Sequence, residues 1–365
     1  MNPSQQTILI NGRFLEQPVT GVQRYAREVL GSLDDLLESG WIDRERFQLV
    51  CLASRAARAV PDWKWIRMEI VGRWTGNLWE QVDLPRTARG QLCFSPANVG
   101  PFFLPGQVVT IHDTSVFAIP QAYSLPFRWK HRVLYNRLGQ TARMILTVSE
   151  FSKRELVRWC GLPTGRIKVI AEGREHILRV PADLTVFERL KIGLKPYFLC
   201  VGSNSPHKNF GVVLDALSRL KHKDFEVIIA GGDFSRVFQS PTRVLPENAR
   251  RVGYLQDAEL RALYQNAAGF IFPSLYEGFG LPPLEAMTCG CPVLCSNATS
   301  LPEVGGDAVL YFDPLNADEL ARLMEQLAAE PGLQSALRQK GARRAEQFSW
   351  QATARATWES LSLGS

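Results

Sequence analysis

The sequence predicts an α/β protein composed of two doubly wound domains, each built on a parallel sheet with helices on both faces. Two observations support this prediction. The chain has 365 residues, of which 45% are hydrophobic and 21% are charged, an ordinary globular composition with enough length for two hydrophobic cores. Short, continuous apolar runs alternate with stretches of helical pattern, which is typical of parallel strands buried on both faces.

The first half of the chain contains six of these apolar runs. Two stretches of helical periodicity, 21–39 and 149–161, lie among them and are expected to form helices. The expected strands, in chain order, are 7–11, 47–53, 91–95, 108–113, 144–149 and 167–171.

The second half repeats the alternation after a polar segment, 174–196, which is the natural connection between two domains. We therefore expect an amino-terminal domain over 1–180 and a carboxyl-terminal domain over 190–347. The last residues, 348–365, have a helical pattern and are expected to pack back on the first domain near the junction. The expected strands of the second half are 197–203, 225–232, 269–274, 291–296 and 308–312.

Composition excludes several classes of protein. No apolar run approaches the roughly 18 uncharged residues that a membrane-spanning helix needs, and the first residues lack the features of a signal peptide, so we expect a cytoplasmic protein. The seven cysteines are an odd number in mostly apolar surroundings, which favours buried free thiols. Cys289 and Cys291 have the wrong spacing for a zinc site. We expect no nucleic-acid partner.

Positive charge is concentrated in the first half of the chain. Residues 1–185 carry 24 Lys and Arg against 17 Asp and Glu, a net charge of +7, whereas the remainder carries 18 against 19, a net charge of −1. A basic aromatic stretch, 126–143, fits an anionic membrane surface or a lipid diphosphate, and fits a solvated helix face equally well. Its basic and aromatic residues include Arg128, Trp129, Lys130, Arg132, Tyr135 and Arg137.

Two carboxylates flank a glycine turn in the stretch "LYEGFGLPPLEAM". Ligands of doubly wound domains bind beyond the carboxyl ends of the strands, where Glu277 and Glu285 follow the expected strand 269–274. Pro282 or Pro283 is expected to start a helix whose first turn holds Glu285. Glycines let backbone N–H groups approach a phosphate, whereas carboxylates accept hydrogen bonds from neutral hydroxyls. The stretch therefore predicts a ligand with both phosphates and hydroxyls. Taken singly, either acid could instead be a helix-dipole or a solvated loop carboxylate.

The segment from Glu277 to Glu285 resembles the E-x7-E signature of retaining nucleotide-sugar glycosyltransferases of family 4, which have the GT-B fold. In that fold two Rossmann-like domains face a deep cleft. The resemblance continues, in the family's order, through most of the chain: 20–30, 110–113, 146–156, 201–209, 252–267 and 272–314. It implies a hexosyltransferase that moves a sugar from a nucleotide-sugar donor to a glycan acceptor and uses no cofactor.

Similarity to bacterial mannosyltransferases of polysaccharide and O-antigen assembly implies GDP-mannose as the donor. It also implies a glycan or polyprenyl-diphosphate-linked acceptor, met at the inner face of the cell membrane. Two alternatives stay open: a transferase that uses a UDP-sugar, and a transferase-like chain that binds nucleotide sugar without catalysis. A dinucleotide-dependent oxidoreductase is disfavoured because "INGRFLEQPVTG" lacks the G-x-G-x-x-G fingerprint after the first strand.

The resemblance also assigns roles on the donor side. It implies that Glu285 holds the ribose hydroxyls and that Glu277 meets hydroxyls of the donor sugar. Lys208 would neutralise the diphosphate leaving group. Many relatives have arginine where this chain has Ser203, so the second cation is open between His207 and an arginine from elsewhere. Backbone groups near the sugar, the phosphate or the base are expected from Gly278, Phe279, Gly280 and Leu281, and from Gly253, Tyr254 and Leu255.

In the first domain the resemblance places His112 close to the anomeric carbon of the donor sugar, with Asp113 either orienting its ring or capping the next segment. Thr20 and Gly21 form a strand-to-helix turn suited to a phosphate or to the acceptor. The chain contains no D-x-D pair, which fits the metal independence of GT-B enzymes, and it shows no obvious nucleophile.

Overall fold

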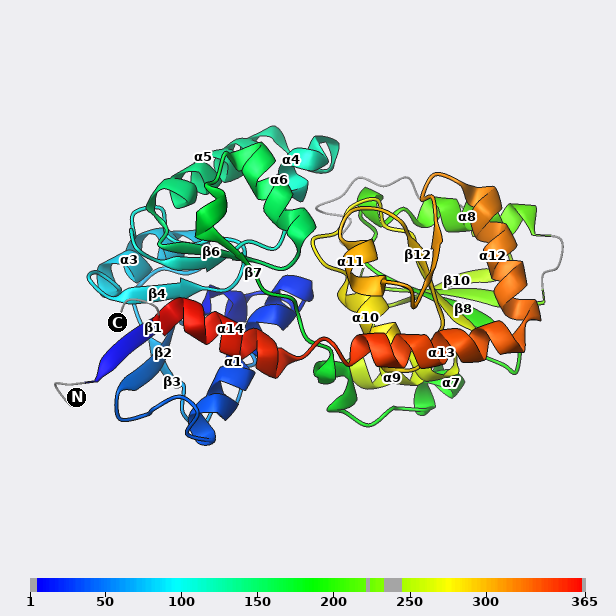
Figure 1. Cartoon of the computed structure of the whole chain (residues 1–365), viewed down its shortest axis with the longest axis horizontal. Coiled ribbons are helices and arrows are strands. Elements are labelled where there is room, and N and C mark those ends of the chain that lie inside the picture. The colour runs from blue at the N-terminus through cyan, green and yellow to red at the C-terminus, as the bar shows by residue number, and fades with distance from the viewer. Residues whose placement is uncertain (1–4, 221–223, 233–244, 363–365) are drawn as a thin grey trace. The chain divides into compact units, whose positions relative to one another are not determined.

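The computed structural model describes residues 5–220, 224–232 and 245–362, and its contacts divide the chain into two compact units (Figure 1). The first unit comprises Met1–Thr114, Leu125–Gly173 and Ser349–Ser365, and the second comprises Ser115–Ser124 and Arg174–Phe348. This division differs from the expected one in that Ser115–Ser124 and residues 174–180 belong to the second unit.

The first unit is built on a seven-stranded sheet in which every pair of neighbours is parallel, in the order β3-β2-β1-β4-β5-β6-β7. The central strand β1 lies between β2 and β4, so that Ile8 is paired with Leu49 on one side and Leu92 on the other. The strands are β1 Gln6–Asn11, β2 Phe47–Ala53, β3 Arg67–Ile70, β4 Leu92–Ser95, β5 Val108–Thr110, β6 Met144–Thr147 and β7 Ile167–Val169.

Helices connect and cover these strands. The helix expected over 149–161 is found as α6. It begins after Ser149, whose side chain accepts from the N–H of Ser152, and it ends before Gly161, which has a φ of 62°. The helical segments of the first unit are η1 Gly12–Glu16, α1 Gly21–Glu38, α2 Gly76–Leu78, η2 Trp79–Asp83, α3 Leu84–Thr87, α5 Leu125–Thr141, α6 Glu150–Cys160, η4 Thr164–Arg166 and α14 Trp350–Ser362.

The carboxyl-terminal helix α14 is an integral part of the first unit. It lies against α1, as Figure 1 shows. The hydroxyl of Thr353 donates to the carbonyl oxygen of Ala171 at 2.7 Å, and the ring of Trp358 meets that of Phe47 edge to face at 4.9 Å. At Gly173 a side chain would come within 2.1 Å of the backbone nitrogen of Trp350, so only glycine permits this approach.

The second unit is built on a six-stranded parallel sheet in the order β10-β9-β8-β11-β12-β13. Its strands are β8 Tyr197–Val201, β9 Glu226–Ala230, β10 Ala249–Gly253, β11 Gly269–Phe272, β12 Val293–Ser296 and β13 Leu310–Phe312. Its helical segments are α4 Ser115–Ala118, η3 Pro120–Ala122, η5 Glu175–Leu178, α7 Thr185–Arg189, η6 Pro206–Lys208, α8 Phe210–Arg219, α9 Asp257–Asn266, α10 Leu281–Thr288, α11 Leu301–Gly305, α12 Ala317–Ala329 and α13 Pro331–Ala345.

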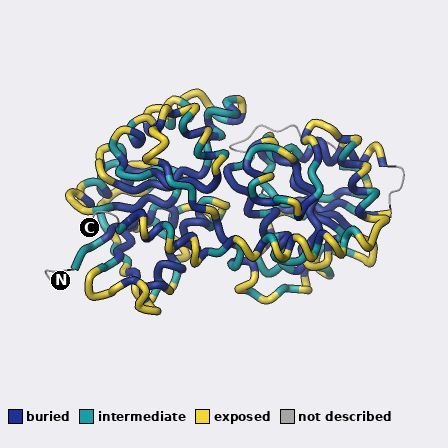
Figure 2. The backbone as a smooth tube through the Cα atoms, in the orientation of Figure 1, coloured by how far each residue is buried: buried dark blue, intermediate teal, exposed yellow. Residues whose placement is uncertain are grey.

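The inner strands of each sheet are buried, and most exposed residues lie on helices, loops and the edge strands β3 and β10 (Figure 2). In the second unit, apolar side chains of α8 and α12 pack together against the sheet, including Val213, Leu217, Leu320 and Met324. All seven cysteines are free, and six are buried, as their apolar surroundings predict. No helix within the described ranges combines the length and the apolar character needed to span a bilayer.

Candidate functional site

The second sheet reverses its strand order between β8 and β11. From β8 the chain proceeds outward through β9 and β10, and then returns to β11 and proceeds the other way. In open parallel sheets such a switch point creates a crevice at the carboxyl ends of the strands, where ligands bind. Lys208 follows β8 and Glu277 follows β11, so the topology brings these two predicted residues to the same place.

Lys208 and Glu277 are in direct contact. The Nζ of Lys208 donates to Oε1 of Glu277 at 2.6 Å, and both side chains are mostly buried. Nζ also lies 5.3 Å from the ring centroid of Phe272 in β11. The loops are joined by a backbone hydrogen bond from Leu275 to the carbonyl oxygen of His207. A cation and a carboxylate are therefore held side by side at the switch point.

The glycine turn is built as the sequence predicts, with one correction. Gly280 precedes α10 with φ of 126°, and a side chain there would come within 2.8 Å of Leu301. Helix α10 begins at Leu281, so Glu285 lies beyond the first turn rather than within it. The hydroxyl of Ser300 donates to the carbonyl oxygens of Glu277 and Phe279, which fixes the turn from the loop after β12.

Glu285 is held by two side chains that the sequence did not single out. Oε1 contacts Nε2 of His176 at 2.8 Å, and Oε2 accepts from the hydroxyl of Tyr264 at 3.1 Å. Burial, and then the negative charge of Glu285, raises the pKa of Tyr264, which keeps its hydroxyl a donor. His176 and Tyr264 thus fix one carboxylate orientation.

The other predicted donor-side residues lie on two segments, one after β8 and one at the end of β10. Ser203 follows β8 and is half-buried. The Nδ1 of His207, one candidate for the second cation, lies 2.7 Å from the hydroxyl of Ser205. Gly253 ends the edge strand β10 with φ of 76°, and its carbonyl oxygen accepts from Gly231. After it, the side chain of Tyr254 is exposed and that of Leu255 is buried.

In the first unit His112 follows β5 and is buried. Its Nδ1 lies 3.3 Å from Oε1 of Glu172, and its Nε2 lies 3.2 Å from the carbonyl oxygen of Pro96. The ring of Tyr25 packs edge to face on the imidazole at 4.5 Å, and burial raises the pKa of Tyr25 to about 12. The carboxylate at the ring is that of Glu172, which follows β7 and which the sequence did not indicate.

Thr20 and Gly21 form the start of α1. The N–H of Thr20 donates to the side-chain oxygen of Gln23 at 3.2 Å, which closes part of the helix end. The space beside Gly21 is open, because a side chain built there would meet no atom within 4 Å.

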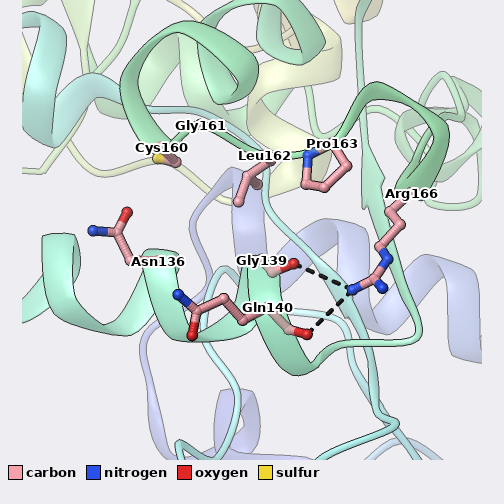
Figure 3. Close-up of a pocket in the computed structure, with 8 residues that line it drawn as sticks. All are labelled: Asn136, Gly139, Gln140, Cys160, Gly161, Leu162, Pro163 and Arg166. Carbon is pink, nitrogen blue, oxygen red and sulfur yellow. Dashed lines mark hydrogen bonds between the residues drawn. The ribbon is translucent and has the colours of Figure 1, made fainter.

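A pocket of about 490 Å³ lies elsewhere in the first unit, between the carboxyl ends of α5 and α6 (Figure 3). Arg166 directs Nη1 to the carbonyl oxygens of Gly139 and Gln140, at 3.5 and 3.2 Å, where it caps α5. Its guanidinium is thus engaged by the helix end, and no predicted site residue lines the pocket. The lining residues are Asn136, Gly139, Gln140, Cys160, Gly161, Leu162, Pro163 and Arg166.

Comparison with known proteins by sequence covers the second unit and up to 68% of the chain. Residues 185–344 match the family model described as "Glycosyl transferases group 1". The O-antigen chain mannosyltransferase B of Escherichia coli is 36% identical over 265 residues, which cover 68% of this chain and 69% of that protein. The serotype-specific mannosyltransferase WbdA of Escherichia coli is 29% identical over 245 residues, which cover 60% of this chain but 29% of that longer protein.

The same architecture occurs among solved structures. The sucrose-phosphate synthase of Thermosynechococcus elongatus superposes with a TM-score of 0.73 over 97% of this chain and 98% of that one, at 19% identity. At this level of identity the similarity concerns the fold, which is that of the GT-B glycosyltransferases.

Proposed function

The chain belongs to the group 1 glycosyl transferases, and we propose that it transfers mannose from GDP-mannose, with retention of anomeric configuration, to a glycan acceptor in bacterial surface polysaccharide assembly. Its 36% identity to an O-antigen mannosyltransferase supports this choice of sugar. The observation that carries the proposal is the Lys208–Glu277 pair, which lies with Glu285 around a glycine turn at the switch point. A nucleotide sugar offers the phosphates and hydroxyls that such a set binds.

The proposed reaction breaks the bond between the anomeric carbon of the sugar and its phosphate oxygen, and forms a bond from that carbon to an acceptor hydroxyl, which loses its proton. Positive charge develops on the sugar and negative charge on the leaving nucleoside diphosphate. Lys208 is proposed to stabilise the diphosphate, together with backbone N–H groups of Phe279, Gly280 and Leu281. Glu277 then has two roles: it pairs with Lys208, and it accepts hydrogen bonds from the sugar hydroxyls.

Glu285 is proposed to bind the ribose. His176 and Tyr264 each contact one of its oxygens and hold the carboxylate in one orientation, and a carboxylate is an acceptor for the hydroxyls that a ribose donates. In the first unit, His112 is proposed to meet the transferred sugar, with its ring oriented by Glu172.

We also propose that transfer needs neither a metal ion nor a cofactor. The support is chemical: Lys208 supplies the cation that a metal supplies in other transferases, and the chain has no D-x-D pair. Activity is therefore expected to survive EDTA. Complete loss with EDTA, reversed by Mn²⁺ or Mg²⁺, would overturn this part of the proposal.

A lipid-linked acceptor and an anionic membrane surface are proposed for the first unit. Helix α5 exposes the apolar side chains of Leu125 and Trp129, 74% and 71% accessible, beside exposed basic residues. Each Lys or Arg near an anionic surface contributes about 1 kcal/mol, screened beyond a Debye length of roughly 8 Å. Sedimentation with anionic and neutral vesicles, using Arg128→Glu/Arg132→Glu as the variant, tests this. Equal binding to both lipids, or undiminished binding of the variant, would contradict it.

Donor identity is tested by thermal unfolding with a panel of nucleoside diphosphates. A ligand at 100 times its dissociation constant stabilises the folded state by about 2.7 kcal/mol, so GDP is expected to raise the melting temperature most. A larger shift with UDP would favour the UDP-sugar alternative. Binding of GDP-mannose without release of GDP, in the presence of acceptor, would favour the binding protein without catalysis.

A further inference from the structure

The first sheet has a switch point of its own, which the proposed donor site does not use. Strand β1 is followed outward by β2 and β3 on one side, and the chain then returns to β4 on the other. The ends of the two strands are joined, since Nδ2 of Asn11 in β1 donates to the hydroxyl of Ser95 in β4 at 3.2 Å. Arg13 lies directly beyond β1. A ligand crevice is expected here for the same topological reason as between β8 and β11.

One helical segment holds two cations at this edge. The Nη1 of Arg13 donates to Oε2 of Glu80 at 2.7 Å, and the Nζ of Lys130 in α5 donates to the side-chain oxygen of Asn77 at 3.2 Å. Asn77 in α2 and Glu80 in η2 are three residues apart in a continuous helical segment, so their side chains lie on one face. Arg13 and Lys130, which are distant in sequence, are thereby brought to neighbouring positions.

The positive charge here exceeds what the protein neutralises. Glu80 is buried, and its other oxygen already accepts from Asn11 at 2.9 Å. The pKa of Lys130 is lowered, first by loss of hydration and then by the charge of Arg13, and Glu80 only partly opposes this. Within the described residues, the Nε of Arg13 is buried and makes no hydrogen bond. Arg13 is therefore ion-paired with Glu80, whereas Lys130 contacts only the neutral amide of Asn77 within the described residues. The ammonium and the Nε of Arg13 are the groups with capacity for a further partner.

We propose that Arg13 and Lys130 form a binding site for a phosphate or diphosphate group of the acceptor, at the carboxyl edge of the first sheet. A guanidinium fixed on one side by Glu80 presents its remaining N–H groups in a planar fork, and the ammonium adds a mobile point charge, which is the combination that suits phosphate oxygens. This inference rests on the proposed function and deepens it, since it makes the acceptor an anion.

Calorimetric titration of pyrophosphate into the full chain tests the site directly. Titrations are made with saturating GDP present and are repeated on a Lys208→Ala chain, so that binding at the donor site is not counted. Lys130→Gln and Arg13→Gln are each expected to weaken pyrophosphate binding about tenfold or more, because each removes a charged hydrogen-bond donor. Arg89→Gln, which removes an exposed arginine of the same unit that has no part in the proposed sites, is the matched control and is expected to bind pyrophosphate as the unaltered chain does.

Absence of pyrophosphate binding in the unaltered chain, or equal binding by Lys130→Gln, would overturn the site. Arg13→Gln leaves the buried Glu80 without its partner and can lose stability, whereas Lys130 is exposed, so the lysine variant decides the outcome if the arginine variant unfolds. GDP binding is measured on the same samples. If the chain does not bind GDP but Lys130→Gln still weakens pyrophosphate binding, the result counts against the proposed donor and not against the acceptor site.

Acceptor assays then identify the source of the phosphate. The Lys130→Gln variant is compared on a polyprenyl-diphosphate-linked sugar, a soluble sugar 1-phosphate and a neutral methyl glycoside. A rise in KM confined to the lipid diphosphate assigns the site to a membrane acceptor, and a rise confined to the sugar phosphate assigns it to a soluble one. An equal rise for the methyl glycoside would contradict recognition of an anion.

Discussion

At the residue scale, the proposed chemistry depends on the pairing of Lys208 with Glu277. The Nζ of Lys208 lies 2.6 Å from Oε1 of Glu277, and both side chains are largely buried. A buried charge is costly unless it is paired, so Glu277 stabilises the lysine ammonium beyond the end of β8. A donor diphosphate would share the same ammonium. The pair therefore places a cation where, in the proposed reaction, negative charge develops on the leaving diphosphate.

Lys208→Ala and Glu277→Ala are each expected to lower kcat by about 100-fold or more, in line with removal of one electrostatic contact to a developing charge. Lys340→Ala, which removes another Lys–Asp/Glu pair of the second unit, at an exposed position, is the control and should keep full activity. Steady-state kinetics with circular dichroism check both points. Unchanged kcat at saturating donor in either site variant would remove the role given to that residue.

Glu172→Gln addresses the positioning of His112. The glutamine keeps the shape of the glutamate but loses its charge, so the ring is expected to shift and kcat to fall by about 10-fold or more, with donor KM nearly unchanged. Glu172→Asp is expected to recover part of the rate. If Glu172→Gln instead changes only thermal stability, the contact is structural and His112 does not depend on it.

The residues that could be predicted from sequence are those that share one short segment with a distinctive pattern. Glu277 and Glu285 flank a glycine turn within a single loop and helix. His176 in η5 and Tyr264 in α9 contact Glu285, and Glu172 contacts His112. No spacing in the sequence connects these three residues to their partners. These three residues meet their partners only in the folded chain.

At the element scale, the expected strands that are buried on both faces were found, and the two missed strands are both edges. β3 has the sequence "RMEI" and β10 has "ARRVG", each with charged residues at exposed positions. An edge strand has one neighbour and needs no continuous apolar run, and charge on it opposes association with other chains. Apolar runs therefore predict the interior of such a sheet better than its margins.

The turn before α10 gives an element-scale prediction. Gly280→Ala would place a side chain against Leu301 at a position where the backbone φ is 126°. The variant is expected to lower the free energy of unfolding by about 1–3 kcal/mol and to weaken donor binding. Gly31→Ala, inside α1 with open space around it, is expected to stabilise by about 0.5–1 kcal/mol. Urea unfolding measures both, and loss of stability of equal size in the two variants would contradict the strain argument.

At the scale of the whole molecule, the chain ends in the unit where it began. Helix α14 completes the first unit's core through Trp350, which is fully buried. Trp350→Ala is expected to cost about 3–5 kcal/mol, whereas Trp65→Ala, at an exposed position, should cost little. In hydrogen exchange, the loss of protection should concentrate in β1, β2 and α1 and spare β8 and β11. Equal loss in both units would contradict the assignment of α14 to the first.

The most direct test of the central claim is a single assay of the purified chain with GDP-mannose and a polyprenyl-diphosphate-linked glycan acceptor. Release of GDP and the mass of the product are measured together, and the anomeric configuration of the new linkage is read by NMR. We expect GDP release that depends on acceptor, a product heavier by one hexose and an α-linkage that retains the configuration of the donor. Transfer from a UDP-sugar in preference, inversion of configuration, or tight donor binding without any product would contradict the account.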